Sequence, residues 1–275
     1  IDDALERGKT YRRALCDARL AAVSYPIELG GANLPAEYEA AGREAALDLL
    51  PGEDSMFTLG VGMAVPTLRE YGTPALQQRF IPAALRGDEV WCQLYSEPGA
   101  GSDLAGLTTR AERDGDEWII TGQKVWNSGA QNAAFGILMA RTDPDLPKHK
   151  GISFFLIDMT QDAVDVRPLR EMTGDIAFNE VFLSEARVAN DDLLGGQGEG
   201  WRVGMTTLSH ERDPDNSGSG SGFDFAGADL TRTAGEHAAA VDGDVDGFGL
   251  AMSGGANRLL DDILDEFDGS ADPIR

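Results

Sequence analysis

The sequence has 275 residues, of which 42% are hydrophobic, and a formal net charge of -24 from 47 acidic and 23 basic side chains. Its length and apolar content suit one large domain or about two to three small ones. No apolar run approaches the roughly 20 residues that cross a bilayer, so we expect no membrane span. So acidic a chain also lacks the basic surface that nucleic acid and anionic membranes require.

The chain start and the cysteines indicate a cellular compartment. The first residues, Ile1-Asp2-Asp3, are acidic and lack a signal-peptide pattern, and an Ile at position 1 suggests that the true beginning is absent. Cys16 and Cys92 form neither a metal-ligand spacing nor a disulfide framework, and the three histidines make no metal cluster. We therefore expect a reduced, cytoplasmic protein without a metal site.

Residues 1–88 are expected to form a helical N-terminal domain. Apolar residues at mixed three and four spacings predict a first helix, and Pro and Gly breaks separate it from three more. The dipeptide Thr73-Pro74 is a typical N-cap followed by Pro in the first turn. Packed helices of this kind suit either a free-standing bundle or one wall of a larger pocket. The predicted helices cover residues 5–20, 36–50, 57–71 and 74–86.

Residues 89–197 predict an antiparallel β-sandwich or barrel, so the fold class is α+β. Short β-prone runs alternate with turns, at a spacing that is typical of small all-β domains. Neither βαβ alternation nor a G-x-G-x-x-G motif is present, which disfavours a Rossmann domain. Beyond a first strand near residues 91–95, the predicted strands cover 107–112, 118–121, 135–141, 152–157, 164–169 and 178–183.

One stretch, residues 90–103, joins a predicted strand to a glycine-rich turn. Small residues in that turn let the main chain approach a ligand closely, and turn amides can face an anion. Ser96 and Ser102 place hydroxyls at both ends of the turn. An ordinary connection between a strand and a loop explains the same residues, so both interpretations stay open at this level.

The C-terminal part changes character twice. Residues 201–212 predict a helix in which Val203, Thr207 and Glu211 share one face. Residues 213–275 carry 14 acidic and 3 basic residues, hence -11 of the total charge, and we expect a largely disordered acidic tail. Asp242 begins a calcium-loop pattern, but its twelfth position is Ser253, so a solvated acidic loop is the preferred interpretation.

Several motifs agree in order and spacing with a known family. They are Tyr95-Ser-Glu-Pro-Gly-Ala-Gly-Ser-Asp103, Gly122-Gln-Lys-Val-Trp-Asn-Ser128, Arg141-Thr-Asp143, Lys148-His-Lys-Gly-Ile-Ser153, Phe178-Asn-Glu180, Gly198-Glu-Gly-Trp201 and Leu208-Ser-His-Glu-Arg212. On these motifs residues 1–212 resemble the acyl-CoA dehydrogenases, flavin enzymes that oxidise the α,β bond of acyl-CoA thioesters. The resemblance implies that residues 198–212 begin a C-terminal four-helix bundle, which the remaining sequence does not match.

The resemblance implies FAD as the cofactor and assigns residues to it. Tyr95, Ser96 and the segment Trp126 to Ser128, which includes Asn127, would line the flavin ring. Ser128 suits a hydrogen bond to flavin N5, Ser96 suits the pyrimidine edge, and Trp126 offers a flat wall. Asn127 departs mildly from the family, which has Thr or Ile there. Ser102 would help to hold the CoA arm of the substrate. For each hydroxyl, a turn or strand-end hydrogen bond is the alternative.

The resemblance also suggests a catalytic base. A carboxylate must remove the α-proton while the β-hydrogen leaves as hydride. Most family members carry that Glu in the C-terminal bundle, and a minority carry it directly before an Arg, the position of Glu211 and Arg212. Glu-Arg also occurs in members whose base lies elsewhere, and Pro214 predicts that the helix ends near Arg212.

Two functions follow from the resemblance. The first is an FAD-dependent acyl-CoA dehydrogenase, as a homo- or hetero-oligomer with an electron-transfer flavoprotein as electron acceptor. The second is a truncated or accessory subunit that is not catalytic and needs a partner chain. The sequence leaves the length and branching of the acyl chain open.

Overall fold

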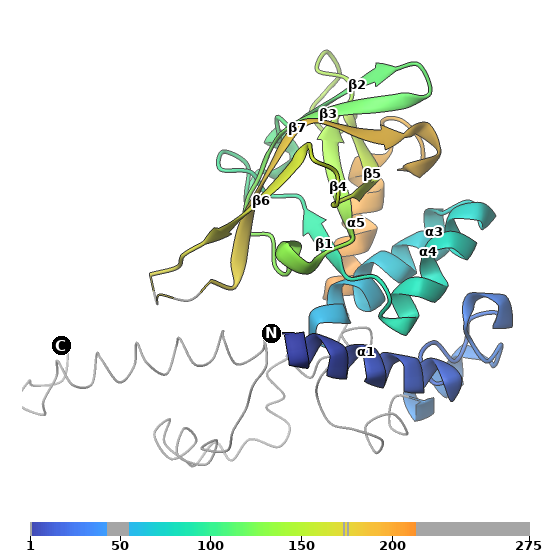
Figure 1. Cartoon of the computed structure of the whole chain (residues 1–275). Coiled ribbons are helices and arrows are strands. Elements are labelled where there is room, and N and C mark those ends of the chain that lie inside the picture. The colour runs from blue at the N-terminus through green and yellow to red at the C-terminus, as the bar shows by residue number, and fades with distance from the viewer. Residues whose placement is uncertain (1, 43–54, 173, 175, 213–275) are drawn as a thin grey trace, which may run out of the picture.

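In the computed structural model, residues 2–42, 55–172, 174 and 176–212 are described. A helical N-terminal region packs against a curved β-sheet, and helix α5 (Gly200–Glu211) runs along both (Figure 1). This order confirms the predicted helical region followed by a β region. The predicted acidic tail, its calcium-like loop and residues 43–50 of the second predicted helix lie outside the described residues.

The N-terminal region contains helices α1 (Asp2–Asp17), α3 (Val65–Tyr71) and α4 (Pro74–Arg86). Short 3-10 turns at Ile27–Leu29, Ala36–Tyr38 and Ser55–Phe57 connect them. Helix α4 begins and ends as predicted, because the Thr73 hydroxyl accepts the Leu76 N–H at 3.3 Å and Gly87 adopts a φ of 71°. Across the described ranges, no helix has the length and apolar character needed to span a bilayer.

The predicted helix over residues 57–71 is interrupted by a π-helical turn, Gly60–Ala64, directly before α3. A Cβ atom on Gly60 would lie 3.1 Å from the Trp91 ring, so glycine allows this turn to approach the first strand closely. The π turn therefore marks the contact between the helical region and the sheet.

The strands form one sheet of eight within the described residues, in the order β6-β7-β3-β2-β4-β5-β8 with β1 beside β4. Most pairs are antiparallel, but β1 is parallel to β4, and β2 meets β4 in parallel at Arg110 and Arg141. The sheet is therefore mixed rather than entirely antiparallel. The strand bounds are β1 (Trp91–Leu94), β2 (Arg110–Asp114), β3 (Glu117–Lys124), β4 (Phe135–Arg141), β5 (Ile152–Asp158), β6 (Val164–Leu169), β7 (Phe178–Ala189) and β8 (Leu193–Leu194).

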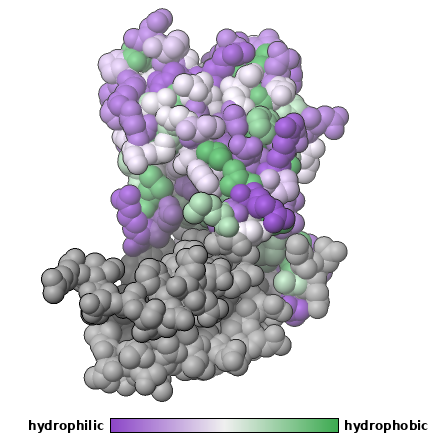
Figure 2. Space-filling model, turned by 90° about the vertical axis from the view of Figure 1, so that its left-hand side faces the viewer, coloured by the Kyte–Doolittle hydropathy of each residue, from purple (hydrophilic) through white to green (hydrophobic). Residues whose placement is uncertain are grey.

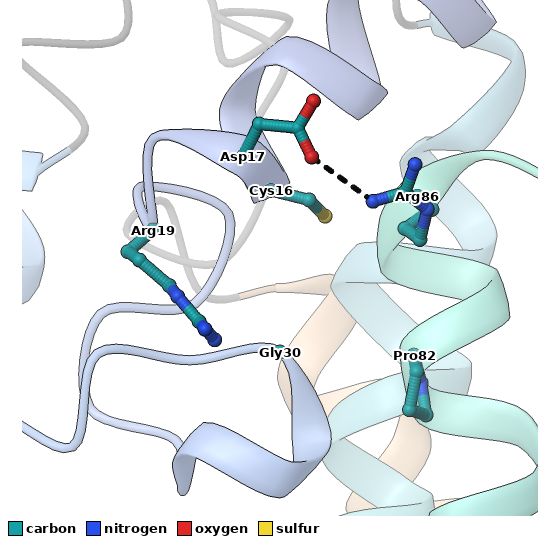
Figure 3. Close-up of a pocket in the computed structure, with 6 residues that line it drawn as sticks. All are labelled: Cys16, Asp17, Arg19, Gly30, Pro82 and Arg86. Atoms are coloured by element: carbon teal, nitrogen blue, oxygen red, sulfur yellow. Dashed lines mark hydrogen bonds and ion pairs between the residues drawn. The ribbon is translucent and has the colours of Figure 1, made fainter.

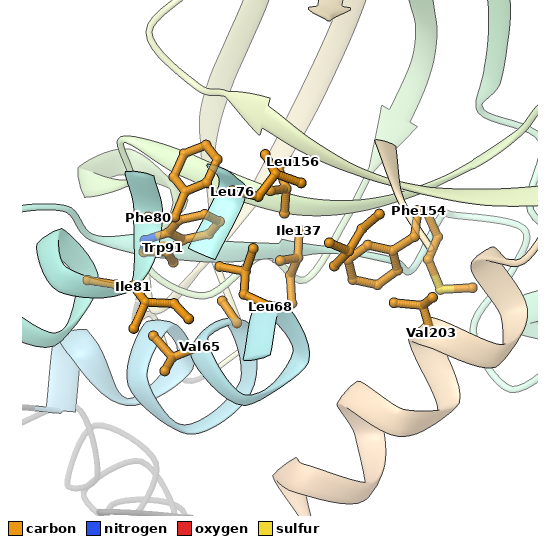
Figure 4. Packing of buried hydrophobic residues seen from close by; sticks show 14 of the residues in the cluster. Val65, Leu68, Leu76, Phe80, Ile81, Trp91, Ile137, Phe154, Leu156 and Val203 are labelled. Atoms are coloured by element: carbon orange, nitrogen blue, oxygen red, sulfur yellow. The ribbon is translucent and has the colours of Figure 1, made fainter. Parts of the chain in front are cut away.

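Two hydrophobic cores lie on the two faces of the sheet. Side chains alternate along β4, so Ile137 faces the helices while the neighbouring Leu138 faces the second core. Figure 4 shows the first core, where residues of α3, α4, β4 and β5 meet Val203 of α5. Because one continuous core joins helices and sheet, the loops at the ends of β1 and β3 are held in fixed positions relative to α5.

Candidate active site

The turn after β1 and the chain leaving β3 lie side by side. The Val125 N–H donates a hydrogen bond to the Ser96 carbonyl at 2.9 Å, and Lys124 Nζ donates to the Tyr95 carbonyl at 3.0 Å. The structure therefore brings the predicted flavin residues Tyr95 and Ser96 next to the segment that carries Trp126, Asn127 and Ser128.

A buried ion pair underlies this contact. Lys124 is fully buried, and its Nζ lies 2.9 Å from Oε1 of Glu97, whose side chain is 4% exposed. Glu97 also accepts the backbone N–H groups of Thr108 and Thr109 at 2.7 and 2.8 Å, and the Thr108 hydroxyl at 2.7 Å. Buried ions are tolerated when paired and fully hydrogen-bonded, which is the arrangement here.

The ion pair shifts the pKa values of both partners. Burial alone would raise the pKa of Glu97, but the Lys124 charge and the hydrogen bonds from Thr109, Lys124 and Thr108 outweigh it and lower the pKa to about 2. Burial lowers the pKa of Lys124 to about 8, against the opposing effect of Glu97. Both groups are therefore charged at neutral pH.

Trp126 presents a large apolar ring to solvent. Its side chain is 56% exposed, and its ring meets Phe178 edge-on with centroids 5.7 Å apart. The φ of Trp126 is 64°, an uncommon value for a residue other than glycine. Hydrogen bonds on both sides maintain this conformation: Val125 to Ser96, and Asn127 in a reciprocal backbone pair with Asn179. The orientation of the Trp126 ring therefore depends on a strained backbone conformation.

Exposed apolar side chains are otherwise scattered over the described residues. They include Ile27, Leu34, Tyr38, Leu146, Met172 and Ile176. Figure 2 shows one face of the molecule, on which apolar groups form small areas among hydrophilic residues. Trp126 is distinguished by its place, beside two polar turns, rather than by membership of a broad apolar patch.

The other predicted flavin residues differ in accessibility. Ser96 and Ser128 are half-buried, and their hydroxyls make no hydrogen bond within the described residues. Asn127 is 1% exposed, and its Nδ2 donates to the Gln93 carbonyl at 2.7 Å. Its Oδ1 is buried without a partner in the described part of the chain. Among the described residues the two serine hydroxyls are thus without a partner, while Asn127 anchors the chain leaving β3 to β1.

Ser102 lies in the exposed glycine-rich turn. Its neighbour Asp103 accepts a salt bridge from Lys148 at 2.6 Å, which connects the turn to the loop between β4 and β5. A Cβ atom at Gly99 or Gly101 would meet nothing within 4 Å, so the main chain there is open to an approaching molecule. Ser102 is therefore accessible and lies apart from the Trp126 ring along the chain.

Helix α5 packs against the same hydrophobic core as Tyr95. Val203 and Thr207 of the predicted face are buried, and Glu211 on the same face is exposed in the last turn. The helix ends at Glu211 and Arg212 follows as its C-cap, as Pro214 had predicted. Burial raises the pKa of the Tyr95 hydroxyl above its usual range, and the negative charge of Glu211 acts in the same direction.

Sequence reasoning missed Glu97, Lys124 and Thr109, which organise the site without being exposed. Glu97 was visible only as part of a motif. Lys124 carried a usable signal, because it is one of four lysines and occupies the inward-facing end of an alternating strand. A lysine at a core position of a strand needs a buried acidic partner.

A separate pocket lies in the helical region, away from these residues. Figure 3 shows Cys16 and Asp17 at the end of α1 facing Arg86 of α4, with Arg19, Gly30 and Pro82 completing the lining. An ion pair of 3.2 Å joins Arg86 to Asp17 across it. None of the predicted site residues lines this pocket, so it is not the site that the motifs indicate.

The helical region, the mixed sheet and the neighbouring motif residues are together typical of one protein family. Comparisons with known proteins identify the same family. The family description "Acyl-CoA dehydrogenase, N-terminal domain" matches residues 2–88, and "Acyl-CoA dehydrogenase, middle domain" matches residues 92–185. The chain belongs to the acyl-CoA dehydrogenase family. Members of this family generally use FAD.

Similar proteins and solved structures align with about three quarters of this chain. Acyl-CoA dehydrogenase FadE34 of Mycobacterium tuberculosis is 49% identical over 200 residues, which are 72% of this chain and 28% of that protein. The solved "Tcur3481-Tcur3483 steroid ACAD" shares 35% identity with a TM-score of 0.64, over 75% of this chain and 53% of that one. The ChsE4-ChsE5 complex from Mycobacterium tuberculosis shares 31% identity with a TM-score of 0.61, over 76% and 54%. The chain spans between about a quarter and about half of these relatives' lengths.

The described residues fit one side of a flavin. A flat isoalloxazine ring requires an apolar wall and hydrogen-bonding groups at its polar edge. The exposed Trp126 ring supplies the wall, and the free hydroxyls of Ser96 and Ser128 lie on the two segments that flank it. These residues would therefore suit one side of the ring end of FAD.

Proposed function

We propose that this chain takes part in the FAD-dependent α,β-dehydrogenation of an acyl-CoA thioester. The main observation that supports this proposal is that an exposed Trp126, held at positive φ, lies beside the hydroxyl-bearing turns of Ser96 and Ser128. When bound there, FAD supplies the acceptor for the hydride that leaves the β-carbon. Family membership supports this assignment.

The chain's own residues would bind and orient the reactants. Trp126 covers one face of the flavin ring, and Ser96 and Ser128 donate hydrogen bonds to its polar edge. Ser102, exposed in the open glycine turn, holds the CoA arm.

Glu211 is the proposed base that takes the α-proton. It follows Thr207 by one turn on the face of α5 that packs on the sheet, and its carboxylate is exposed. A base must be reachable by substrate and lie within hydrogen-bond range of the proton that it removes. Arg212, next along the chain, offers a positive charge beside the carboxylate.

A partner chain belongs to the proposal. Two similar solved structures carry titles that name two proteins each, the Tcur3481-Tcur3483 steroid ACAD and the ChsE4-ChsE5 complex. By analogy with these two-protein structures, a homologous or different subunit would cover the open side of the flavin. An electron-transfer flavoprotein is the proposed electron acceptor, and a steroid-derived acyl-CoA is the first substrate to examine.

The test is a visible absorption spectrum of the purified chain, alone and with its partner, followed by anaerobic titration with acyl-CoA thioesters. A flavin spectrum that bleaches when thioester is added supports the proposal. A chain that takes up no FAD under either condition contradicts it.

A non-catalytic accessory subunit is the alternative. The exposure of Glu211 in the last turn of α5 favours it, because nothing in the described residues fixes that carboxylate. Such a subunit would increase the turnover of a partner while its own Glu211 remains dispensable. A monodisperse monomer that retains flavin and turns over substrate would contradict this alternative.

A further inference from the structure

We propose that Lys124 is a positioning residue of the flavin site, because its buried ammonium holds the turn after β1 against the chain leaving β3. The inference rests on the proposed function of this chain in flavin chemistry. The Lys124 side chain is fully buried and would not contact the ligand itself. Its role would be to fix the position of Ser96 relative to Trp126.

The geometry of Lys124 supports this role. Its Nζ donates to the Tyr95 carbonyl at 3.0 Å and to Glu97 Oε1 at 2.9 Å, so it binds on both sides of Ser96. Ser96 itself accepts the N–H of Val125, the residue after Lys124, at 2.9 Å. Three consecutive residues of one segment are therefore bound to two consecutive residues of the other.

Glu97 extends the junction to a third segment. Its carboxylate accepts two backbone N–H groups, from Thr108 and Thr109, directly before β2. A neutral core would need none of these charges, and an apolar side chain of similar volume would fill the space of Lys124 equally well. The ion pair is thus better explained by the three segments that it aligns than by stability.

The alignment matters for Trp126 because the strained φ of that residue lies two positions beyond Lys124. If the Lys124 bonds are removed, the Val125 hydrogen bond remains as the sole described backbone link between the turn of Ser96 and this segment. The ring and the Ser96 hydroxyl would then sample positions that do not match one planar ligand.

The experiment compares Lys124→Met and the double variant E97Q/K124M with the wild-type chain, in complex with its partner if one is needed. Hydrogen exchange at the amides of Val125, Thr108 and Thr109 reports the junction directly. FAD affinity and the absorption spectrum of the bound flavin report its effect on the site. The double variant removes both charges, so it avoids an unpaired buried carboxylate and keeps the test valid if Lys124→Met does not fold.

We expect faster exchange at Val125 in both variants, a changed shape of the flavin spectrum, and FAD affinity weaker by about tenfold, as is typical when a group that orients a ligand contact is removed. Leu15→Ala is the matched control, because Leu15 is a buried residue of α1 in a separate hydrophobic cluster. This control lowers thermal stability and leaves Val125 exchange and the flavin spectrum unchanged.

Each outcome decides the inference. Wild-type exchange and wild-type flavin affinity in the double variant overturn it, as does an equal change in the Leu15→Ala control. If the wild-type protein binds no FAD, the proposed function fails separately. In that case, unchanged Val125 exchange in the variants overturns the junction as well, and faster exchange supports the junction while its role toward flavin is overturned.

Discussion

Thr67 and Thr207 share a hydrogen bond of 3.0 Å between their hydroxyls, although 140 positions separate them in the chain. Both side chains are fully buried. The Thr207 hydroxyl donates to the Val203 carbonyl at 3.0 Å, and the single proton of the Thr67 hydroxyl is shared between Thr207 and the Met63 carbonyl, 2.7 Å away. The pair therefore connects α3 to the helix that carries Glu211.

A double-mutant cycle measures this connection. Thr67→Val and Thr207→Val each lose one shared hydrogen bond and are expected to lower the free energy of unfolding by about 1 kcal/mol. The double variant is expected to lose less than the sum, with a coupling of about 0.5–1 kcal/mol. Urea unfolding of the four proteins provides the values, and strict additivity would show that the two hydroxyls do not support each other.

Glu211→Gln tests the proposed base. It removes proton acceptance and keeps the size of the side chain, so turnover is expected to fall by about 10²–10⁴-fold while flavin content is unchanged. Glu199→Gln, at the other end of α5, is the control, since Glu199 is also exposed and pairs only with Arg202 among the described residues. Dye reduction with acyl-CoA measures both. Equal activity of Glu211→Gln and wild type would favour the accessory-subunit alternative.

Trp126→Ala tests the exposed wall. The side chain is largely in solvent, so the variant is expected to unfold within about 1 kcal/mol of wild type. FAD affinity is nevertheless expected to fall, by about tenfold, because stacking of an aromatic side chain on a planar ring is typically worth about 1–3 kcal/mol. Trp118→Ala provides the contrast: that residue is 2% exposed and is expected to lose about 3–5 kcal/mol of stability. Flavin titration and thermal unfolding of both variants separate the two effects.

The Glu97–Lys124 pair predicts a specific loss of stability in acid. The pKa of Glu97 is about 2 in the folded chain against a usual 4.5, so the folded state binds fewer protons than the unfolded state in that range. The contribution of ionising Glu97 in the folded state, about 3 kcal/mol relative to its protonated form, is therefore present above pH 4.5 and is lost as the pH falls toward 2, whatever the net contribution of the pair with Lys124.

E97Q/K124M isolates this contribution from the many other carboxylates. Urea midpoints are measured for wild type and variant at intervals from neutral pH downward, and the wild-type midpoint is expected to fall relative to that of the variant below pH 4.5. Parallel curves over the whole range would mean that Glu97 has an ordinary pKa.

Local signals account for the parts of the fold that sequence predicted well. Helix α4 follows from Thr73-Pro74 at its start and Gly87 at its end, and α5 ends at Glu211 because Pro214 excludes a further turn. Strands β4 and β6 match their predicted ranges, since their apolar patterns are bounded by turns. Each of these features depends on a few neighbouring residues.

Features that depend on distant residues were not predictable in this way. The parallel pairing of β1 with β4 joins Trp91 to Phe135 and leaves no local pattern in either strand. Strand β7 continues past residue 183, its predicted end, because a bulge opposite Ile120 lets the pairing with β3 resume. Glu185, the extra residue of the bulge, has a φ of 63°. The burial of Lys124 likewise becomes evident only when β1 and β3 are seen together.

Three aromatic rings have a consequence for the synthesis of this protein on the ribosome. Phe80 of α4, Trp91 of β1 and Phe135 of β4 pack together with centroids 5.0–5.4 Å apart. The helices emerge first, yet their apolar face is covered only after Phe135 has been made. A nascent chain that ends before Phe135 is therefore expected to expose that face, to bind a hydrophobic dye and to be a target for chaperones. A chain that continues through β5 is expected to lose the dye.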